Sequence, residues 1–80
     1  MKKEEQQYYD NYLDLFLHPG WKQLQESLET TAEQLRDITT IRDQRDLDFR
    51  QGQLANVTTL LTFEGATRAT LEALEAEDAI

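Results

Sequence analysis

Eighty residues make one domain at most, and a chain of this length buries only roughly 60% of the surface that its unfolded form exposes. The chain has no cysteine and one histidine, so disulfides and a structural zinc site are excluded as supports for a thin core. Sixteen acidic against eight basic residues give a formal net charge of -8, which disfavours nucleic-acid phosphates and anionic membranes as partners and favours basic protein surfaces.

Hydropathy predicts a soluble chain. No apolar run approaches the ~20 residues that a membrane-spanning helix needs. Residues 4–7 are acidic or amide side chains where a secretory signal carries an apolar stretch, so we expect no such signal. The lack of cysteine is compatible with a reducing compartment.

The first predicted helix covers about residues 4–17. Tyr8, Tyr12 and Phe16 recur at every fourth position and therefore form one aromatic stripe. Pro19 ends this helix, because proline has no amide proton and clashes with the preceding turn. Proline is well tolerated in the first turn of a helix, so a second helix is expected to begin there.

The second predicted helix covers about residues 19–38. Its seam positions step by three or four residues, a pattern typical of helix packing, and Thr31 is the one weakly apolar member: Trp21, Leu24, Leu28, Thr31, Leu35 and Ile38. The β-branched residues 39–41 favour an end to the helix. Asp43, followed by Asp46 three residues later, is typical of the N-cap and acidic first turn of another helix.

The third predicted helix covers about residues 43–76 and would be a rod of ~50 Å, little more than half of which the second helix could cover. The uncovered part must either bend, for which Gly65 offers a place, or pack against another chain. Gly52, also within this helix, predicts either the close approach of another backbone or a tolerated surface position.

These patterns predict an all-α protein of three helices: a helical hairpin with a long C-terminal helix and a short N-terminal helix folded onto it. The expected internal core comprises Trp21, Leu24, Leu28, Leu54, Val57 and Leu61. The candidate partner-binding residues are Tyr8, Tyr12, Phe63, Leu71 and Leu74, because aromatic and large apolar side chains anchor interfaces as well as cores.

Catalytic, metal and cofactor chemistry finds no support in the sequence. A nucleophile needs an oriented base, and the chain offers one histidine, no cysteine and the single Ser27. Arginines interleave the acidic cluster of Asp43, Asp46 and Asp48, and the calcium-loop spacing is absent. No glycine-rich loop precedes a helix. We expect a non-enzymatic protein without metal or cofactor.

Two segments carry a resemblance to a known group of proteins. Pro19-Gly20-Trp21 begins one helix, and Arg50-Gln51-Gly52-Gln53-Leu54 lies in the next. Together with Leu60-Leu61-Thr62-Phe63-Glu64, this arrangement resembles small helical proteins of tailed bacteriophages, over roughly residues 13–65. The resemblance implies a viral source, a helical fold and a location in the virion or the host cytoplasm; most such proteins have no assigned activity.

The leading functional hypothesis is a virion structural or assembly component that binds a larger phage structural protein in several copies, with self-association as a second kind of contact. The alternative is an acidic early inhibitor that occupies a basic surface of a host enzyme such as RNA polymerase or a nuclease. Glu26, Glu29 and Glu33, along one side of the second helix, fit that alternative. A nucleic-acid-binding role is disfavoured, because aspartates cancel the charge of the arginine-rich segment.

Overall fold

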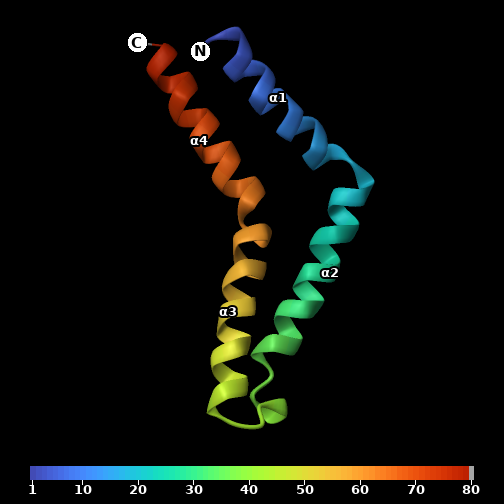
Figure 1. Ribbon diagram of the computed structural model, residues 1–80. Coiled ribbons are helices and arrows are strands. Elements are labelled where there is room, and N and C mark those ends of the chain that lie inside the picture. The colour runs from blue at the N-terminus through green and yellow to red at the C-terminus, as the bar shows by residue number, and fades with distance from the viewer. Residues whose placement is uncertain (80) are drawn as a thin grey trace.

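The computed structural model describes residues 1–79, which form four α-helices and one short 3₁₀ helix (Figure 1). The elements are α1 (Lys3–Leu17), α2 (Pro19–Arg36), η1 (Ile38–Thr40), α3 (Gln44–Leu61) and α4 (Phe63–Asp78). No β-strand occurs within residues 1–79. The predicted all-α class is therefore confirmed.

The helices form two bent arms that lie side by side. One arm consists of α1 followed by α2, and the other of α3 followed by α4, so that the two ends of the chain lie together (Figure 1). The α2 helix packs against α3, and α1 packs against α4. The N-terminal ammonium group of Met1 forms an ion pair with Asp78 at the shared end of the arms.

The first arm bends at His18 and Pro19. The α1 helix ends at Leu17, and Pro19 begins α2 because its fixed φ suits the first helical turn. His18 is the N-cap of α2, and its Nδ1 atom accepts a hydrogen bond from the Gly20 amide at 2.9 Å. The single histidine thus satisfies a helix terminus that would otherwise lack a partner.

The prediction of three helices is wrong, because the expected third helix is two helices that meet at Thr62. The Thr62 amide donates to the Thr58 carbonyl at 2.9 Å, and the Thr62 hydroxyl donates to the same carbonyl at 2.8 Å. At Thr62 the backbone departs from helical values, with φ −96° and ψ 0°. The bend therefore lies three residues before the expected Gly65, and the N-terminal helix folds onto α4 rather than onto a continuous hairpin.

An aromatic cluster joins the two arms where they bend. Its members are Tyr12, Phe16, Trp21 and Phe63, with ring centroids of Phe16 and Trp21 5.2 Å apart and those of Tyr12 and Phe63 5.1 Å apart. Each such pair contributes about 0.5–1.5 kcal/mol beyond the burial of its area. The Trp21 indole also donates to the Glu64 carboxylate at 3.0 Å. This cluster holds α1 and α2 of one arm against α4 of the other.

The core is small and differs in part from the expected one. The buried apolar residues among those described are Phe16, Trp21, Ala32 and Leu71. Of the six expected core residues, Trp21 is buried, four are half-buried (Leu28, Leu54, Val57 and Leu61), and Leu24 is 46% exposed. Leu24 lies outside the core because no third helix covers the α2–α3 pair.

The molecule is thin and elongated. Its principal extents are 53 × 27 × 16 Å, and its radius of gyration is 17.1 Å, against roughly 12 Å for a compact domain of this length. Its accessible surface is 6288 Å², whereas a compact monomer of 9.3 kDa exposes roughly 5,000 Å². Most domains bury their apolar faces between two layers, but here the helices lie in one.

The surroundings of Gly52 decide between its two predicted roles and give a test of the fold. Among residues 1–79, no atom outside the neighbouring helical backbone lies within 4 Å of a Cβ atom built at Gly52, so no other described backbone segment approaches it closely. Gly52→Ala should raise the free energy of unfolding, measured in urea, by about 1 kcal/mol, because glycine is costly inside a helix. In the control Gly20→Ala, the new Cβ would lie 3.0 Å from the capping nitrogen of His18, and this gain should be absent.

Candidate interaction surface

Two stripes of side chains, one on α2 and one on α3, border the same side of the molecule. On α2 the stripe is Leu24, Leu28, Thr31 and Leu35, and on α3 it is Phe49, Gln53, Val57 and Leu60; both have helical spacing. A shallow cavity of about 380 Å³ is lined by members of both stripes, among them Thr31 and Gln53. We call these two stripes together the α2–α3 face.

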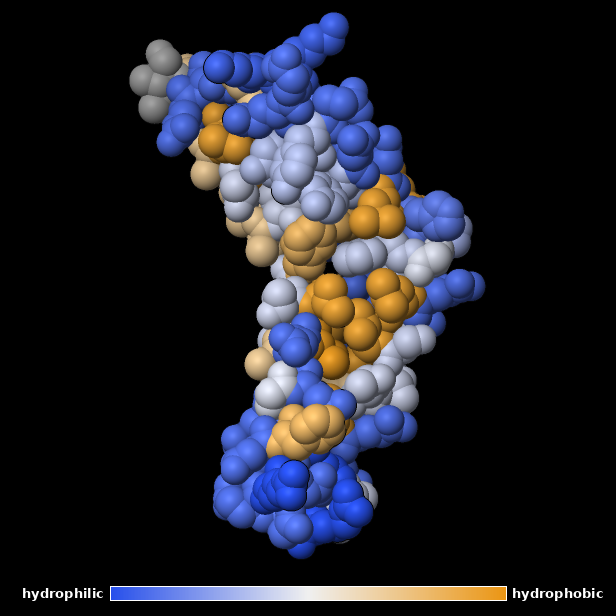
Figure 2. Space-filling model, viewed as in Figure 1, coloured by the Kyte–Doolittle hydropathy of each residue, from blue (hydrophilic) through white to orange (hydrophobic). Residues whose placement is uncertain are grey.

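The α2–α3 face exposes large apolar side chains. Leu24 is 46% exposed, Leu60 is 45% exposed and Phe49 is 65% exposed. Gln25 donates to the Leu60 carbonyl at 3.4 Å, so Leu24 and Leu60 lie at the same level of the helix pair. Figure 2 shows apolar side chains gathered between the arms near mid-length, with another apolar group further toward the α2–α3 connection.

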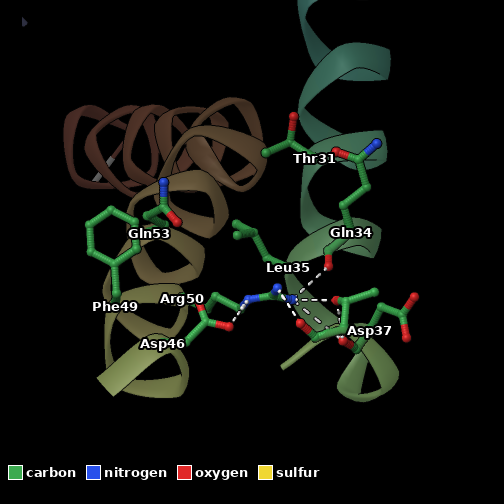
Figure 3. Close-up of a pocket in the computed structure, with 9 residues that line it drawn as sticks. Thr31, Gln34, Leu35, Asp37, Asp46, Phe49, Arg50 and Gln53 are labelled. Carbon is green, nitrogen blue, oxygen red and sulfur yellow. Dashed lines mark hydrogen bonds and ion pairs between the residues drawn. The ribbon is translucent and has the colours of Figure 1, made fainter. Parts of the chain in front are cut away.

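Arg50 of α3 contacts the end of α2 at the part of the α2–α3 face that lies nearest the connection between the two helices (Figure 3). Its guanidinium donates to the Thr40 hydroxyl at 2.7 Å and to the Thr40 carbonyl at 2.9 Å, and more weakly to the carbonyls of Gln34 and Asp37 at 3.4 Å. These carbonyls lie at the end of α2 and in η1, where intrahelical partners are lacking. Arg50 therefore caps α2 from the neighbouring helix.

Two carboxylates accept hydrogen bonds from the segment that connects α2 to α3. The Arg42 amide donates to Asp46 at 3.1 Å, and this bond, together with the charges of Arg50 and Arg42, lowers the pKa of Asp46. The hydroxyl and amide of Thr39 donate to Asp37 and lower its pKa in the same way. These hydrogen bonds stabilise the connection between Asp37 and Asp46, and Phe49 projects from α3 just beyond it.

The predicted partner-binding residues divide between the surface and the interior. The rings of Tyr8, Tyr12 and Phe63 form a chain of edge-to-face contacts, with centroids 5.1 Å apart at both steps. They line a pocket of about 220 Å³ between α1 and α4, where Tyr8 is 56% exposed and the other two are half-buried. Leu71 is buried within the chain and Leu74 is half-buried. The first three residues therefore gather at one place, whereas Leu71 packs inside.

Sequence reasoning missed Leu24, Phe49 and Leu60 as surface residues. Leu24 belongs to the regular apolar row of α2 and was expected to be internal. Phe49 and Leu60 lie eleven residues apart, close to three helical turns, and beside the inward row that contains Leu47, Leu54 and Leu61. That second, offset row was the available signal for an additional apolar face on α3.

Two further properties of residues 1–79 bear on function. No group of three or more histidine, cysteine, aspartate or glutamate side chains lies close enough together to hold a metal ion in this part of the chain. Among the helices described, none combines the length and the apolar character needed to cross a membrane.

Replacing Arg50 tests its role as a cap. Arg50→Ala should lower the free energy of unfolding by about 2 kcal/mol, because several carbonyls at the end of α2 lose a charged donor. The control is Arg45→Ala, an exposed arginine of the same helix, which should change it by less than about 0.5 kcal/mol. Equal effects of the two substitutions in urea denaturation would show that the Arg50 contacts contribute nothing beyond ordinary surface charge.

Asp46 makes the stability of this connection depend on pH. Its pKa in the folded state lies below the ordinary value of 3.8, so its ionised form stabilises the fold above that pH and this contribution is lost as the pH falls through the folded pKa. Asp46→Asn should therefore be less stable than the original chain at pH 7, and the difference should shrink toward pH 2. The same comparison in the Arg50→Ala background should give a smaller difference at pH 7.

No protein-family model, no curated protein and no solved structure matches this chain.

Proposed function

We propose that this chain is a non-enzymatic binding protein that acts as a virion structural or assembly component through contacts between its helices and other protein chains. The observation that supports this proposal is the α2–α3 face, where large apolar side chains lie open along a single layer of helices. Apolar faces on soluble domains commonly mark sites of protein association.

The energetics of the exposed side chains favour association. Complete burial of a leucine or phenylalanine side chain contributes about 1.5–3 kcal/mol, and Leu24, Leu60 and Phe49 still expose between 45% and 65% of their surface. A partner that covers all three would gain part of this free energy at each position. The side chains of leucine and phenylalanine are hydrocarbons, with no catalytic group and no metal ligand. Their exposure therefore favours protein binding rather than catalysis.

The total surface supports the same proposal. The chain exposes 6288 Å², and a compact monomer of its mass exposes roughly 5,000 Å². The excess is larger than the roughly 800 Å² that each partner buries in a standard protein interface. Association over one broad side would bring the exposed surface of each chain to that of an ordinary small domain.

The resemblance to small proteins of tailed bacteriophages supports a virion as the setting. The resemblance spans roughly residues 13–65, a stretch that contains α2 and α3. A structural role in several copies also suits a small chain whose own core is thin.

A second candidate function rests on the acidic side of α2. Glu26, Glu29 and Glu33 are exposed, and none of them forms an ion pair within residues 1–79. With a net charge of -8, this row favours the basic surface of a host enzyme such as RNA polymerase or a nuclease. This candidate differs from the first in depending on charge rather than on apolar area.

Two sets of substitutions separate the candidates. The immobilised chain is used to capture proteins from infected cells, and the captured proteins are identified. Under the leading proposal Leu24→Ser with Leu60→Ser should abolish the capture of a virion protein, because the apolar contact is lost. The charge variant carries Glu26→Gln, Glu29→Gln and Glu33→Gln and should leave that capture intact.

The opposite pattern would support the second candidate. The original chain would then capture a host enzyme, and the charge variant would not. High salt would also abolish the capture, because it screens charge pairs at exposed sites. Both variants should remain folded, since all five positions are exposed and such substitutions usually change stability little. Circular dichroism and urea denaturation provide this control.

A further inference from the structure

We propose that the pocket between α1 and α4 binds an arginine side chain of a protein partner, held among aromatic rings and by the hydroxyl of Thr67. The inference goes beyond the proposed function, because this pocket is built by α1 and α4, whereas the α2–α3 face belongs to the other two long helices. The pocket contains Tyr8, Tyr12 and Phe63, three of the residues that the sequence predicts as partner contacts.

The size of the pocket suits a single side chain. Its volume is about 220 Å³, below the roughly 300–1,000 Å³ of sites for small molecules and cofactors. Apart from aromatic rings, the lining comprises the Ala66 methyl group and the hydroxyl-bearing side chains of Thr67 and Thr70. None of these lining residues is charged. The occupant is therefore a side chain that aromatic faces and hydroxyl oxygens can hold.

The aromatic rings of the pocket stand nearly at right angles to one another. The centroids of Tyr8 and Tyr9 are 5.2 Å apart with an interplanar angle of 88°, and those of Tyr8 and Tyr12 are 5.1 Å apart with an angle of 82°. Phe63 of α4 stands at 74° to Tyr12. Rings at such angles present their faces in different directions, as in the aromatic cages that bind organic cations. The electron-rich face of each ring attracts a positive charge.

Thr67 supplies a polar group that has no partner in the described chain. The residue is only 9% exposed, and its hydroxyl forms no hydrogen bond within residues 1–79. The neighbouring Thr70 differs, because its hydroxyl donates to the Ala66 carbonyl at 3.0 Å. Among the described residues no fully enclosed polar side-chain atom lacks a partner, so the Thr67 hydroxyl reaches solvent through the pocket that it lines. A ligand that donates a hydrogen bond there would satisfy its oxygen.

The surroundings of the pocket are acidic. The α1 and α4 helices contain nine acidic side chains against two basic ones and so carry most of the net charge of -8. Glu5 is exposed and precedes Tyr8 and Tyr9 by three and four residues, so it lies on their side of α1, one turn nearer the chain ends. Lys2 and the Met1 ammonium offset only part of this charge. A cationic occupant is therefore favoured over an acidic one.

Arginine fits these features better than the other candidate side chains. Its guanidinium is planar and stacks on aromatic rings, and it has several N–H donors, of which one can bond Thr67. The lysine ammonium is a compact and strongly hydrated charge, and it cannot stack on a ring as a planar group does. An apolar side chain would contact the rings but leave the Thr67 hydroxyl without a partner.

Titration of the full chain with short peptides, followed by NMR, tests the assignment. The probe is a capped alanine peptide that contains one arginine. It should shift the resonances of the Thr67 methyl group and of the Tyr8 and Tyr12 rings, with a dissociation constant in the millimolar range. The same peptide with citrulline, which has the shape of arginine without its charge, should bind roughly tenfold more weakly. Added salt should weaken binding of the arginine peptide, because salt screens the surrounding charge.

Matched substitutions assign the binding to the pocket. Thr67→Val keeps the size of the side chain but removes the hydroxyl, and it should weaken binding of the arginine peptide roughly fivefold. Thr70→Val is the control and should leave binding unchanged, because the Thr70 hydroxyl already has a partner. Tyr8→Leu should weaken binding, whereas Tyr8→Phe should retain it, because phenylalanine keeps the aromatic face. Circular dichroism checks that each variant is folded.

Three results would overturn the proposal. Equal binding of a leucine peptide would show that the pocket takes an apolar side chain. Equal binding of the citrulline peptide would show that the charge contributes nothing. Unchanged resonances at peptide concentrations well above the millimolar range would show that the pocket holds no arginine. Each result leaves the proposed function standing, because that function is tested by capture through Leu24 and Leu60 of the α2–α3 face.

Discussion

The packing of Phe16, Trp21 and Phe63 is the contact on which the rest of the structure depends. It lies where both arms bend, and it joins segments that are far apart in the sequence. The α1 and α4 helices contain 15 and 16 residues, close to the ~12–15 residues below which isolated helices are marginal in water. Their stability therefore comes mainly from packing against each other beside this cluster.

Polar groups fix the orientation of the cluster. Glu64 accepts hydrogen bonds from Trp21 at 3.0 Å and from Arg68 at 3.1 Å, and the Arg68 guanidinium lies over the Phe16 ring at 5.5 Å. A cation over an aromatic face is attracted by the ring quadrupole. These contacts require Phe63 and Glu64 to turn toward α1 and α2, which the bend at Thr62 permits. The same bend directs α4 toward α1 and leaves the α2–α3 pair without a covering helix.

The sequence predicted the features that local chemistry controls. Proline marks the joint between α1 and α2, and Asp43 caps α3, because each acts within one turn of its own position. The break at Thr62 was missed because residues 58–66 contain nothing that forbids a helix, and the bend serves contacts with distant Phe16 and Trp21. The burial of Leu24 was predicted wrongly for a related reason. The apolar row of α2 shows which side of the helix can be buried, but that side is buried only where another helix covers it. Tyr12 and Phe63 belong to different helices, and the spacing of residues within one helix does not reveal a contact between two helices.

The joint between the arms also gives the molecule a built-in optical reporter. Trp21 is the only tryptophan of the chain, and its indole is buried between Phe16 and Phe63 with its nitrogen bound to Glu64. Separation of the arms would expose this ring to water and shift its fluorescence to longer wavelength, even if every helix stayed intact. Comparing fluorescence with far-ultraviolet circular dichroism therefore distinguishes opening of the arms from unfolding of the helices.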